Sequence, residues 1–129
     1  MDPFNPIHQH LLIKAIITGP PTDPDVGKRM LVELVKLVDM VPVTTPSAVY
    51  VTTLGNEGLT GSINLATSHI AFHIWDTTGL LMLDVYSCTI FDEQLVFKYL
   101  DGFFGGLLRL DWLVIDREAL EVTERGFRQ

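Results

Sequence analysis

The chain has 129 residues, of which 47% are hydrophobic, and a formal net charge of −7 with only 9 Lys and Arg. This length is typical of one domain, so a single domain over residues 1–129 is expected. The shortage of cations argues against nucleic acid as a partner, because phosphate binding needs clustered Lys and Arg. Charges interrupt every apolar run well before the roughly 20 residues that cross a bilayer, so no membrane partner is expected either.

The N-terminal residues lack the basic and apolar regions of a signal peptide, and the single Cys88 cannot form an internal disulfide. Both features favour a cytoplasmic location. The hydrophobic content is high for so small a chain. We therefore expect part of the surface to be covered by a second subunit.

Turn residues and hydrophobic periodicity predict six strands and two helices. Residues 1–6 hold two prolines and are expected to form an arm. The strands are predicted over residues 8–18, 48–54, 60–67, 69–76, 80–87 and 108–116. The helices are predicted over residues 24–40, behind the cap Asp23, and 93–103, behind the cap Asp92. Glycines at 102, 105 and 106 are expected to end the second helix, and the polar tail from Arg117 is expected to fray.

The predicted order is one strand, one helix, four strands, one helix and one strand. Such an order is typical of an α+β two-layer sandwich, in which a mostly antiparallel sheet carries both helices on one face. The other face of the sheet is then free for function or for a subunit contact.

The stretch from Thr60 to Cys88 holds most of the residues with chemical potential. Side chains alternate along the strand predicted over residues 69–76. Its apolar face is formed by Ile70, Phe72 and Ile74. Its other face is polar and aromatic, as expected for a site, and is formed by His69, Ala71, His73 and Trp75.

The following strand returns through a tight turn at 77–79 and should bring Cys88 near the start of the histidine strand. Ser68, His73 and Cys88 are therefore expected to lie close together. Ser68 and His73 are five residues apart and would face opposite ways in an unbroken strand, so their cooperation requires a break or bulge near 67–68. Each residue alone also has an ordinary explanation: a buried small side chain for Cys88, a hydrogen-bonded strand residue for His73 and a turn residue for Ser68.

The spacing of these residues resembles a known family. The matching segments are Gly58-Leu59-Thr60-Gly61, Ala66-Thr67-Ser68-His69-Ile70, His73-Ile74-Trp75 and Leu83-Asp84-Val85-Tyr86-Ser87-Cys88. They resemble the core of the prokaryotic S-adenosylmethionine decarboxylases, pyruvoyl enzymes of polyamine synthesis. The spacing of serine, histidine and cysteine is kept without a gap.

The resemblance implies autocatalytic cleavage between Thr67 and Ser68, with Ser68 converted to a covalent pyruvoyl cofactor. The ketone of that group would form a Schiff base with the substrate amine and accept electrons as carbon dioxide leaves. By the same resemblance, His73 would assist the cleavage and Cys88 would act as general acid. Thr60 stands where the family has a serine whose hydroxyl helps processing.

The resemblance also marks four substrate-binding positions, at which only Trp75 is kept. Leu54 replaces an aromatic residue that would stack on adenine, and Asp76-Thr77 replaces a Pro-Glu pair whose glutamate would bind the ribose. Thr67 likewise replaces a glutamate before the serine. The expected activity is decarboxylation of S-adenosylmethionine for spermidine synthesis by a homodimer. The alternatives are decarboxylation of arginine or ornithine, and an unprocessed homologue that serves as a binding or regulatory subunit.

Two other motifs carry little weight. His8 and His10 share one face of the first predicted strand and resemble half of a metal site, but no third ligand is apparent in the sequence, and no metal is expected. The glycines of residues 102–106 lack the lysine of a phosphate-binding loop, so they are interpreted as the end of a helix.

Overall fold

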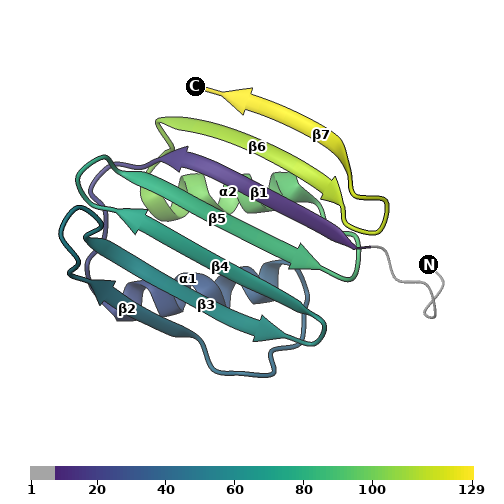
Figure 1. Cartoon of the computed structure of the whole chain (residues 1–129), viewed down its shortest axis with the longest axis horizontal. Coiled ribbons are helices and arrows are strands. Elements are labelled where there is room, and N and C mark those ends of the chain that lie inside the picture. The colour runs from purple at the N-terminus through teal and green to yellow at the C-terminus, as the bar shows by residue number, and fades with distance from the viewer. Residues whose placement is uncertain (1–7) are drawn as a thin grey trace.

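The computed structural model describes residues 8–129, so the predicted arm lies outside the described residues. In chain order the elements are β1 Gln9–Ile16, α1 Pro24–Leu37, β2 Ser47–Val51, β3 Gly58–Leu65, β4 Ser68–Trp75, β5 Leu80–Ser87, α2 Glu93–Phe104, β6 Arg109–Asp116 and β7 Glu121–Arg128. The seven strands of the described chain form one antiparallel sheet in the order β2-β3-β4-β5-β1-β6-β7. Both helices cover the same face of this sheet (Figure 1). The predicted α+β two-layer sandwich is therefore confirmed.

The helix boundaries follow from capping. The Asp23 carboxylate accepts a hydrogen bond from the Asp25 N–H at 2.9 Å, and the Asp92 carboxylate accepts one from the Gln94 N–H at 3.0 Å. Helix α1 ends at Leu37, earlier than predicted, and the chain then turns at residue 39 with a φ of 55°. Helix α2 ends at Phe104 and is capped by Gly105, which has a φ of 71°. Gly102 lies inside α2 and does not end it, because one glycine weakens a helix by only about 1 kcal/mol.

The prediction that the tail from Arg117 frays is wrong, since residues 121–128 form β7 on the outer edge of β6. Gly126 pairs with Trp112 and leaves room for its indole, because a Cβ on Gly126 would lie 1.9 Å from the ring. Arg128 also donates to Asp101 of α2 at 2.7 Å. An edge strand that is mostly exposed needs no apolar alternation, so its sequence gave no strand signal.

The core lies between the sheet and the helices. Its sheet side is built from alternate residues of the central strands, which are at most 3% exposed: Leu11, Ile13, Ile70, Phe72, Ile74, Leu83 and Val85. The helices contribute Met30, Leu31, Leu34, Val96, Phe97 and Leu100. Burial of each such side chain contributes about 1.5–3 kcal/mol, so this layer fixes the register of the strands.

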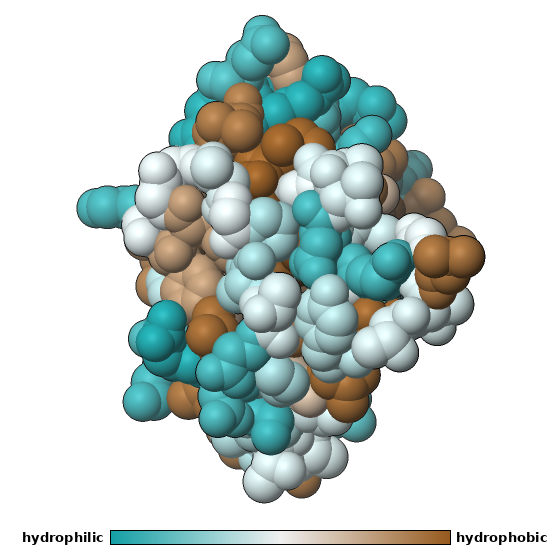
Figure 2. Space-filling view, turned by 90° about the vertical axis from the view of Figure 1, so that its left-hand side faces the viewer, coloured by the Kyte–Doolittle hydropathy of each residue, from teal (hydrophilic) through white to brown (hydrophobic). Residues whose placement is uncertain are grey.

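The opposite side of the sheet, called the open face below, faces away from α1 and α2 (Figure 1). Figure 2 shows the end of the molecule where the β2–β3 and β4–β5 turns lie, with hydrophilic and hydrophobic side chains interspersed. Leu54 in the β2–β3 turn is 92% exposed. Among the described residues, no helix has the length and apolar character needed to cross a membrane.

Candidate active site

Ser68 is the first residue of β4 and follows the two-residue turn Ala66-Thr67 from β3. Its side chain is buried, and its Oγ accepts a hydrogen bond from the Cys88 N–H at 3.1 Å. Cys88 comes directly after β5, which pairs with β4, and its thiol is free and half-buried. The structure thus brings Ser68 and Cys88 together, as the hairpin geometry predicts.

The residue before Ser68 is held in an unfavourable conformation. Thr67 has a φ of 58°, in the left-handed region that β-branched residues rarely adopt. Its Oγ1 donates to the Ala66 carbonyl at 2.6 Å, which helps to hold the turn. A strained backbone of this kind costs about 1–3 kcal/mol and persists only where the surrounding structure enforces it, here the paired β3 and β4. The Thr67–Ser68 bond therefore lies at a strained point of the hairpin.

A second pair lies further along the same hairpin. Thr60 on β3 is paired with His73 on β4, and its Oγ1 lies 3.1 Å from the His73 Nδ1. The His73 and Trp75 rings are neighbours on the open face, with centroids 6.1 Å apart. The Trp75 Nε1–H donates to the Asn56 side-chain oxygen at 3.0 Å, which fixes the indole near the β2–β3 turn.

The predicted grouping of Ser68, His73 and Cys88 is wrong for the uncleaved chain. Strand β4 pairs with both neighbours in continuous register and contains no bulge. Ser68 therefore lies on the helix side and His73 on the open face. Five residues of strand also separate them by about 16 Å. The break near residue 67 is a hairpin turn that reverses the chain, and it does not rotate Ser68 toward His73.

The four positions assigned to substrate binding lie at the other end of β4 from Ser68. Trp75 is on the open face, and Leu54 projects into solvent. The Tyr50 hydroxyl donates a hydrogen bond to Asp76 Oδ2, and this bond, with burial, raises the pKa of Tyr50. Tyr50 packs on the helix-side core, so Asp76 is held away from Trp75. Thr77 lies in the tight turn before β5.

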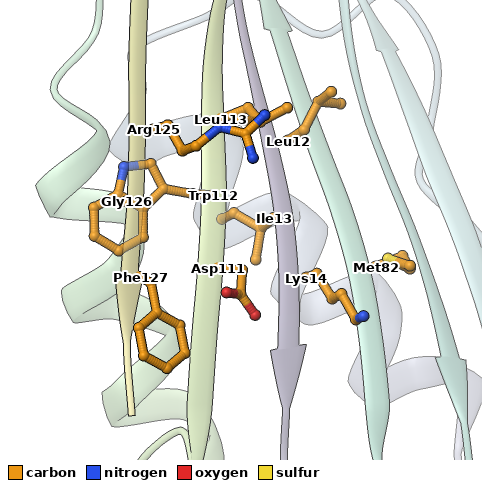
Figure 3. A pocket seen from close by; sticks show the side chains of 10 residues that line it. All are labelled: Leu12, Ile13, Lys14, Met82, Asp111, Trp112, Leu113, Arg125, Gly126 and Phe127. Atoms are coloured by element: carbon orange, nitrogen blue, oxygen red, sulfur yellow. The ribbon is translucent and has the colours of Figure 1, made fainter.

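A hollow of about 550 Å³ opens on the open face over β1, β6 and β7 (Figure 3). Met82, at one side of it, is paired with His73, so the hollow lies beside the Thr60–His73 pair and not beside Ser68. The residues that line it include Leu12, Lys14, Asp111, Leu113, Arg125 and Phe127. Sequence reasoning missed this feature because two of these residues belong to the tail that was expected to fray.

A cluster around Asp84 was also missed. His10 on β1 and His69 on β4 both bond to the Asp84 carboxylate on β5, so ligand-type side chains do lie beside His10. The sequence signal was the alternation that places Asp84 and His69 on the open face. Burial raises the pKa of Asp84, but the hydrogen bonds and electrostatic attraction of the two neighbouring imidazoles outweigh burial and hold the pKa below its ordinary value.

Comparison with known proteins decides the family. A family model described as S-adenosylmethionine decarboxylase matches residues 18–117, a span that includes Thr60, Ser68, His73 and Cys88. The chain belongs to the S-adenosylmethionine decarboxylase family. The match covers more than half of the chain and ends before β7.

Individual relatives of this decarboxylase family agree. The S-adenosylmethionine decarboxylase proenzyme of Archaeoglobus fulgidus is 35% identical over 60 residues, which are 46% of this chain and 51% of that protein. The proenzyme of Thermoplasma volcanium is 47% identical over 32 residues, which are 25% of each protein. The matches thus span a quarter to a half of these relatives. The crystal structure of the adenosylmethionine decarboxylase of Aquifex aeolicus shares the fold, with a TM-score of 0.66 at 22% identity over 97% of this chain and 99% of that one.

Proposed function

We propose that this protein is the proenzyme of a pyruvoyl-dependent S-adenosylmethionine decarboxylase that cleaves itself between Thr67 and Ser68. The observation that carries the proposal is the local geometry of that bond. A buried serine hydroxyl, held by the Cys88 N–H, directly follows a threonine with a φ of 58°. The family match over residues 18–117 includes this junction and both residues.

Cleavage would proceed on the chain's own atoms. The Ser68 Oγ attacks the Thr67 carbonyl carbon, the C–N bond breaks, and an ester joins the two residues. Loss of the Ser68 α-proton and of the Thr67 carboxylate then splits the chain and leaves a dehydroalanine. Water replaces its nitrogen, which departs as ammonia, and the remaining fragment begins with a pyruvoyl group. Hydrogen bonding from the Cys88 N–H supports the first step by keeping the Oγ beside the turn.

The pyruvoyl group would supply a ketone that withdraws electrons from the substrate carbon as carbon dioxide leaves. The residues at this end of the sheet fit such a group, since Ser68 is buried and the Cys88 N–H already faces its side chain. The half-buried Cys88 thiol would return a proton to the substrate carbon. The Thr60 hydroxyl orients the His73 imidazole from the opposite strand.

The enzyme is proposed to work as a homodimer. Within one chain, the Thr60–His73 pair and Trp75 lie far along β4 from Ser68. The open face carries half-exposed polar and aromatic side chains and is not covered by either helix. A two-fold axis that crosses β4 at right angles would bring the Trp75 end of one chain over the Ser68 end of its partner. Ser68 of the uncleaved chain points to the helix side, so each site would draw residues from both copies only after cleavage frees the new N-terminus to turn toward the open face.

S-adenosylmethionine is the proposed substrate, for the synthesis of spermidine. Trp75 offers an aromatic surface for an adenine ring. Asp76, however, is engaged by Tyr50, so ribose recognition falls to other residues. Arginine and ornithine are the alternative substrates, because the ketone chemistry requires only an α-amino acid.

Intact-protein mass spectrometry tests the proposal. The purified protein should give two fragments that divide at 67–68, and Ser68→Ala should give one species at 14.4 kDa. A single uncleaved wild-type species would overturn the enzyme proposal and support a non-catalytic binding or regulatory subunit. For the cleaved protein, release of carbon dioxide from S-adenosylmethionine, arginine and ornithine identifies the substrate.

Complementation tests the shared site. Ser68→Ala cannot form the cofactor but keeps Trp75, whereas Trp75→Ala keeps Ser68. Each variant alone should be inactive or nearly so, and their co-expression should restore part of the activity. No restoration, with a dimer confirmed by analytical ultracentrifugation, would show that each site uses residues of one chain only.

A further inference from the structure

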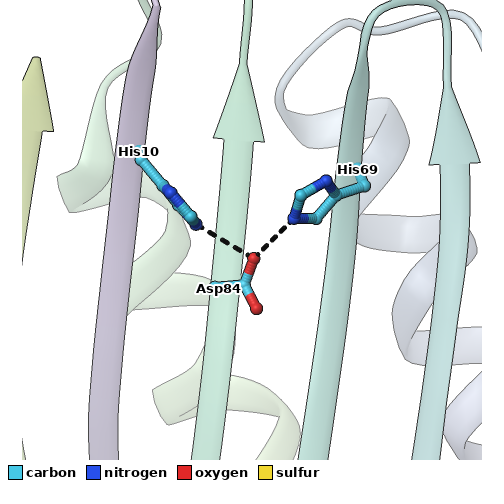
Figure 4. Close-up of side chains that lie close together, drawn as sticks. All are labelled: His10, His69 and Asp84. Carbon is cyan, nitrogen blue, oxygen red and sulfur yellow. Dashed lines mark hydrogen bonds and ion pairs between the residues drawn. The ribbon is translucent and has the colours of Figure 1, made fainter. Parts of the chain in front are cut away.

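The cluster formed by His10, His69 and Asp84 has no role in the proposed cleavage. Figure 4 shows the two imidazoles converging on one carboxylate from the strands on either side of it. The Nε2 atoms of His10 and His69 lie 3.0 and 2.9 Å from the same Asp84 oxygen, Oδ1. Their side chains range from 13% exposed for His10 to 42% exposed for His69, with Asp84 at 29%. In the single chain the cluster is thus accessible from the open face but partly shielded from water.

The strand register explains this convergence. Strand β5 lies between β4 and β1, and Tyr86 on β5 is paired with both His10 and His69. Asp84 is two residues from Tyr86 on the same face, so each histidine reaches it along a diagonal. All three side chains stand on central, hydrogen-bonded strands, which hold ligands more rigidly than loops do.

We propose that His10, His69 and Asp84 bind a divalent first-row transition metal ion, such as Zn²⁺, Ni²⁺ or Co²⁺. Two imidazoles and one carboxylate are a ligand set that suits these ions and leaves positions open for water or a small ligand. Ligand atoms about 2.1 Å from an ion and 90–109° apart lie about 3.0–3.4 Å from one another. Two of the three separations, 3.0 and 2.9 Å, lie at or just below the lower end of this range, and all three ligand atoms lie within 4.8 Å of one another.

Arg117 opposes the binding of a metal ion, so its replacement tests the proposal. Its guanidinium donates to the His10 Nδ1 at 2.9 Å, so without a metal the proton of His10 is on Nε2 and points at Asp84. Ligation through Nε2 moves that proton to Nδ1, where it meets the Arg117 donor. Arg117 must then turn away, and it already lies over the Tyr86 ring with its Cζ 5.0 Å from the centroid. Arg117 and the metal ion therefore compete for His10.

The test is calorimetric titration of ZnCl₂ and NiCl₂ into the chelator-treated full-length protein, with the visible spectrum of added Co²⁺ as a second readout. One ion should bind per chain. Asp84→Asn and His69→Ala should each weaken binding at least about tenfold. Arg117→Gln should tighten it several-fold, because the competing donor and a nearby positive charge are lost. His73→Gln is the matched control, because His73 lies on the same strand and face as His69 but outside the cluster. This variant should leave the affinity for the metal ion unchanged.

Circular dichroism of each variant separates misfolding from loss of a ligand. If His69→Ala unfolds, Asp84→Asn still tests the site, because asparagine has nearly the same shape as aspartate. A dissociation constant weaker than about 1 mM for all three ions would overturn the proposal. Equal affinity of wild type, Asp84→Asn and His69→Ala would also overturn it by showing adventitious binding elsewhere. Weaker binding by Arg117→Gln would overturn the assigned competition. None of these readouts depends on cleavage at Ser68 or on decarboxylation.

Discussion

The backbone N–H of Cys88 donates to the Ser68 side-chain oxygen at 3.1 Å, so the contact between these two residues does not involve the thiol. The peptide between Ser87 and Cys88 is fixed by local bonds, since the Ser87 Oγ also donates to the Thr89 carbonyl at 2.6 Å. Removal of the thiol therefore leaves the donor to Ser68 in place, so the proposed self-cleavage can be tested separately from the proposed decarboxylation.

Cys88→Ala should still cleave at 67–68 at close to the wild-type rate but should lose at least about 10²-fold in turnover, the usual contribution of a general acid. Mass spectrometry measures the cleavage, and release of carbon dioxide measures the turnover. Loss of cleavage in a folded Cys88→Ala protein would show that the thiol itself takes part in maturation. Unchanged turnover would remove Cys88 from its proposed role.

Thr67→Gly tests the strain at the proposed cleavage point. Glycine adopts a positive φ without penalty and so removes about 1–2 kcal/mol of strain. Its greater conformational freedom in the unfolded chain lowers the stability of the fold by about 0.5–1 kcal/mol. Net stability should rise by about 0.5–1 kcal/mol in chemical denaturation of the Ser68→Ala background, where no cleavage interferes. If release of strain assists cleavage, Thr67→Gly should also slow it, by up to about tenfold. Thr67→Ala keeps the strain and serves as the control, and faster cleavage by Thr67→Gly would contradict this role for strain.

The Thr60–His73 hydrogen bond predicts that the hydroxyl group at residue 60 is required for function. Thr60→Val keeps the shape but removes the partner 3.1 Å from the His73 Nδ1, so the imidazole loses its fixed orientation. The rates of cleavage and of carbon dioxide release should fall by about 10-fold to 100-fold, and Thr60→Ser should restore most of both rates. Cleavage and carbon dioxide release are both measured. Equal activity of the Val and Ser variants would show that this hydrogen bond has no functional part.

Gly126 and Gly102 form a matched pair for testing β7. A Cβ at Gly126 would lie 1.9 Å from the Trp112 indole, whereas a Cβ at Gly102 in α2 would meet nothing within 4 Å. Gly126→Ala should destabilise the protein by about 1–3 kcal/mol, as expected for overpacking. Gly102→Ala should stabilise it by about 0.5–1 kcal/mol, because alanine favours a helix interior. Chemical denaturation measures both, and a neutral Gly126→Ala would show that β7 does not pack on Trp112 in solution.

Asp101 ties α2 to β7 in a pH-dependent way. Burial raises the pKa of Asp101, but the Leu107 N–H at 3.0 Å and the Arg128 guanidinium at 2.7 Å outweigh burial and hold the pKa below its ordinary value of 3.8. A lowered pKa means that the ionised form stabilises the fold above about pH 3.8 and that this stability is lost as the pH falls through the folded-state pKa.

Asp101→Asn should therefore lower the free energy of unfolding by about 0.5–1 kcal/mol at pH 7, and the difference from wild type should vanish in acid. Arg128 is 44% exposed, so high salt should reduce the difference at pH 7. Denaturation of both proteins from pH 2 to pH 7 checks this expectation. A constant difference across that range would rule out the charge on Asp101 as its source.

The sequence by itself determined the family and most of the local structure, with β7 the exception. The caps Asp23 and Asp92 set the starts of both helices. Strict alternation in β4 and β5 placed Ile70, Phe72 and Leu83 in the core, because a one-residue shift would expose every apolar side chain. The spacing of Ser68, His73 and Cys88 pointed to the decarboxylase family, since a short chemical motif is a local property of the chain.

Only the tertiary structure decided how these residues meet. Ser68 lies beside Cys88 but far from His73, because β4 runs straight after the turn at Thr67 and each residue moves the chain by about 3.3 Å. Strand β7 forms although its own residues are mostly exposed, because it needs only the free edge of β6. His10 and His69 converge on Asp84 because β1 and β4, distant in sequence, both pair with β5. Strand order depends on contacts between distant segments, and the pattern within any one segment does not contain it.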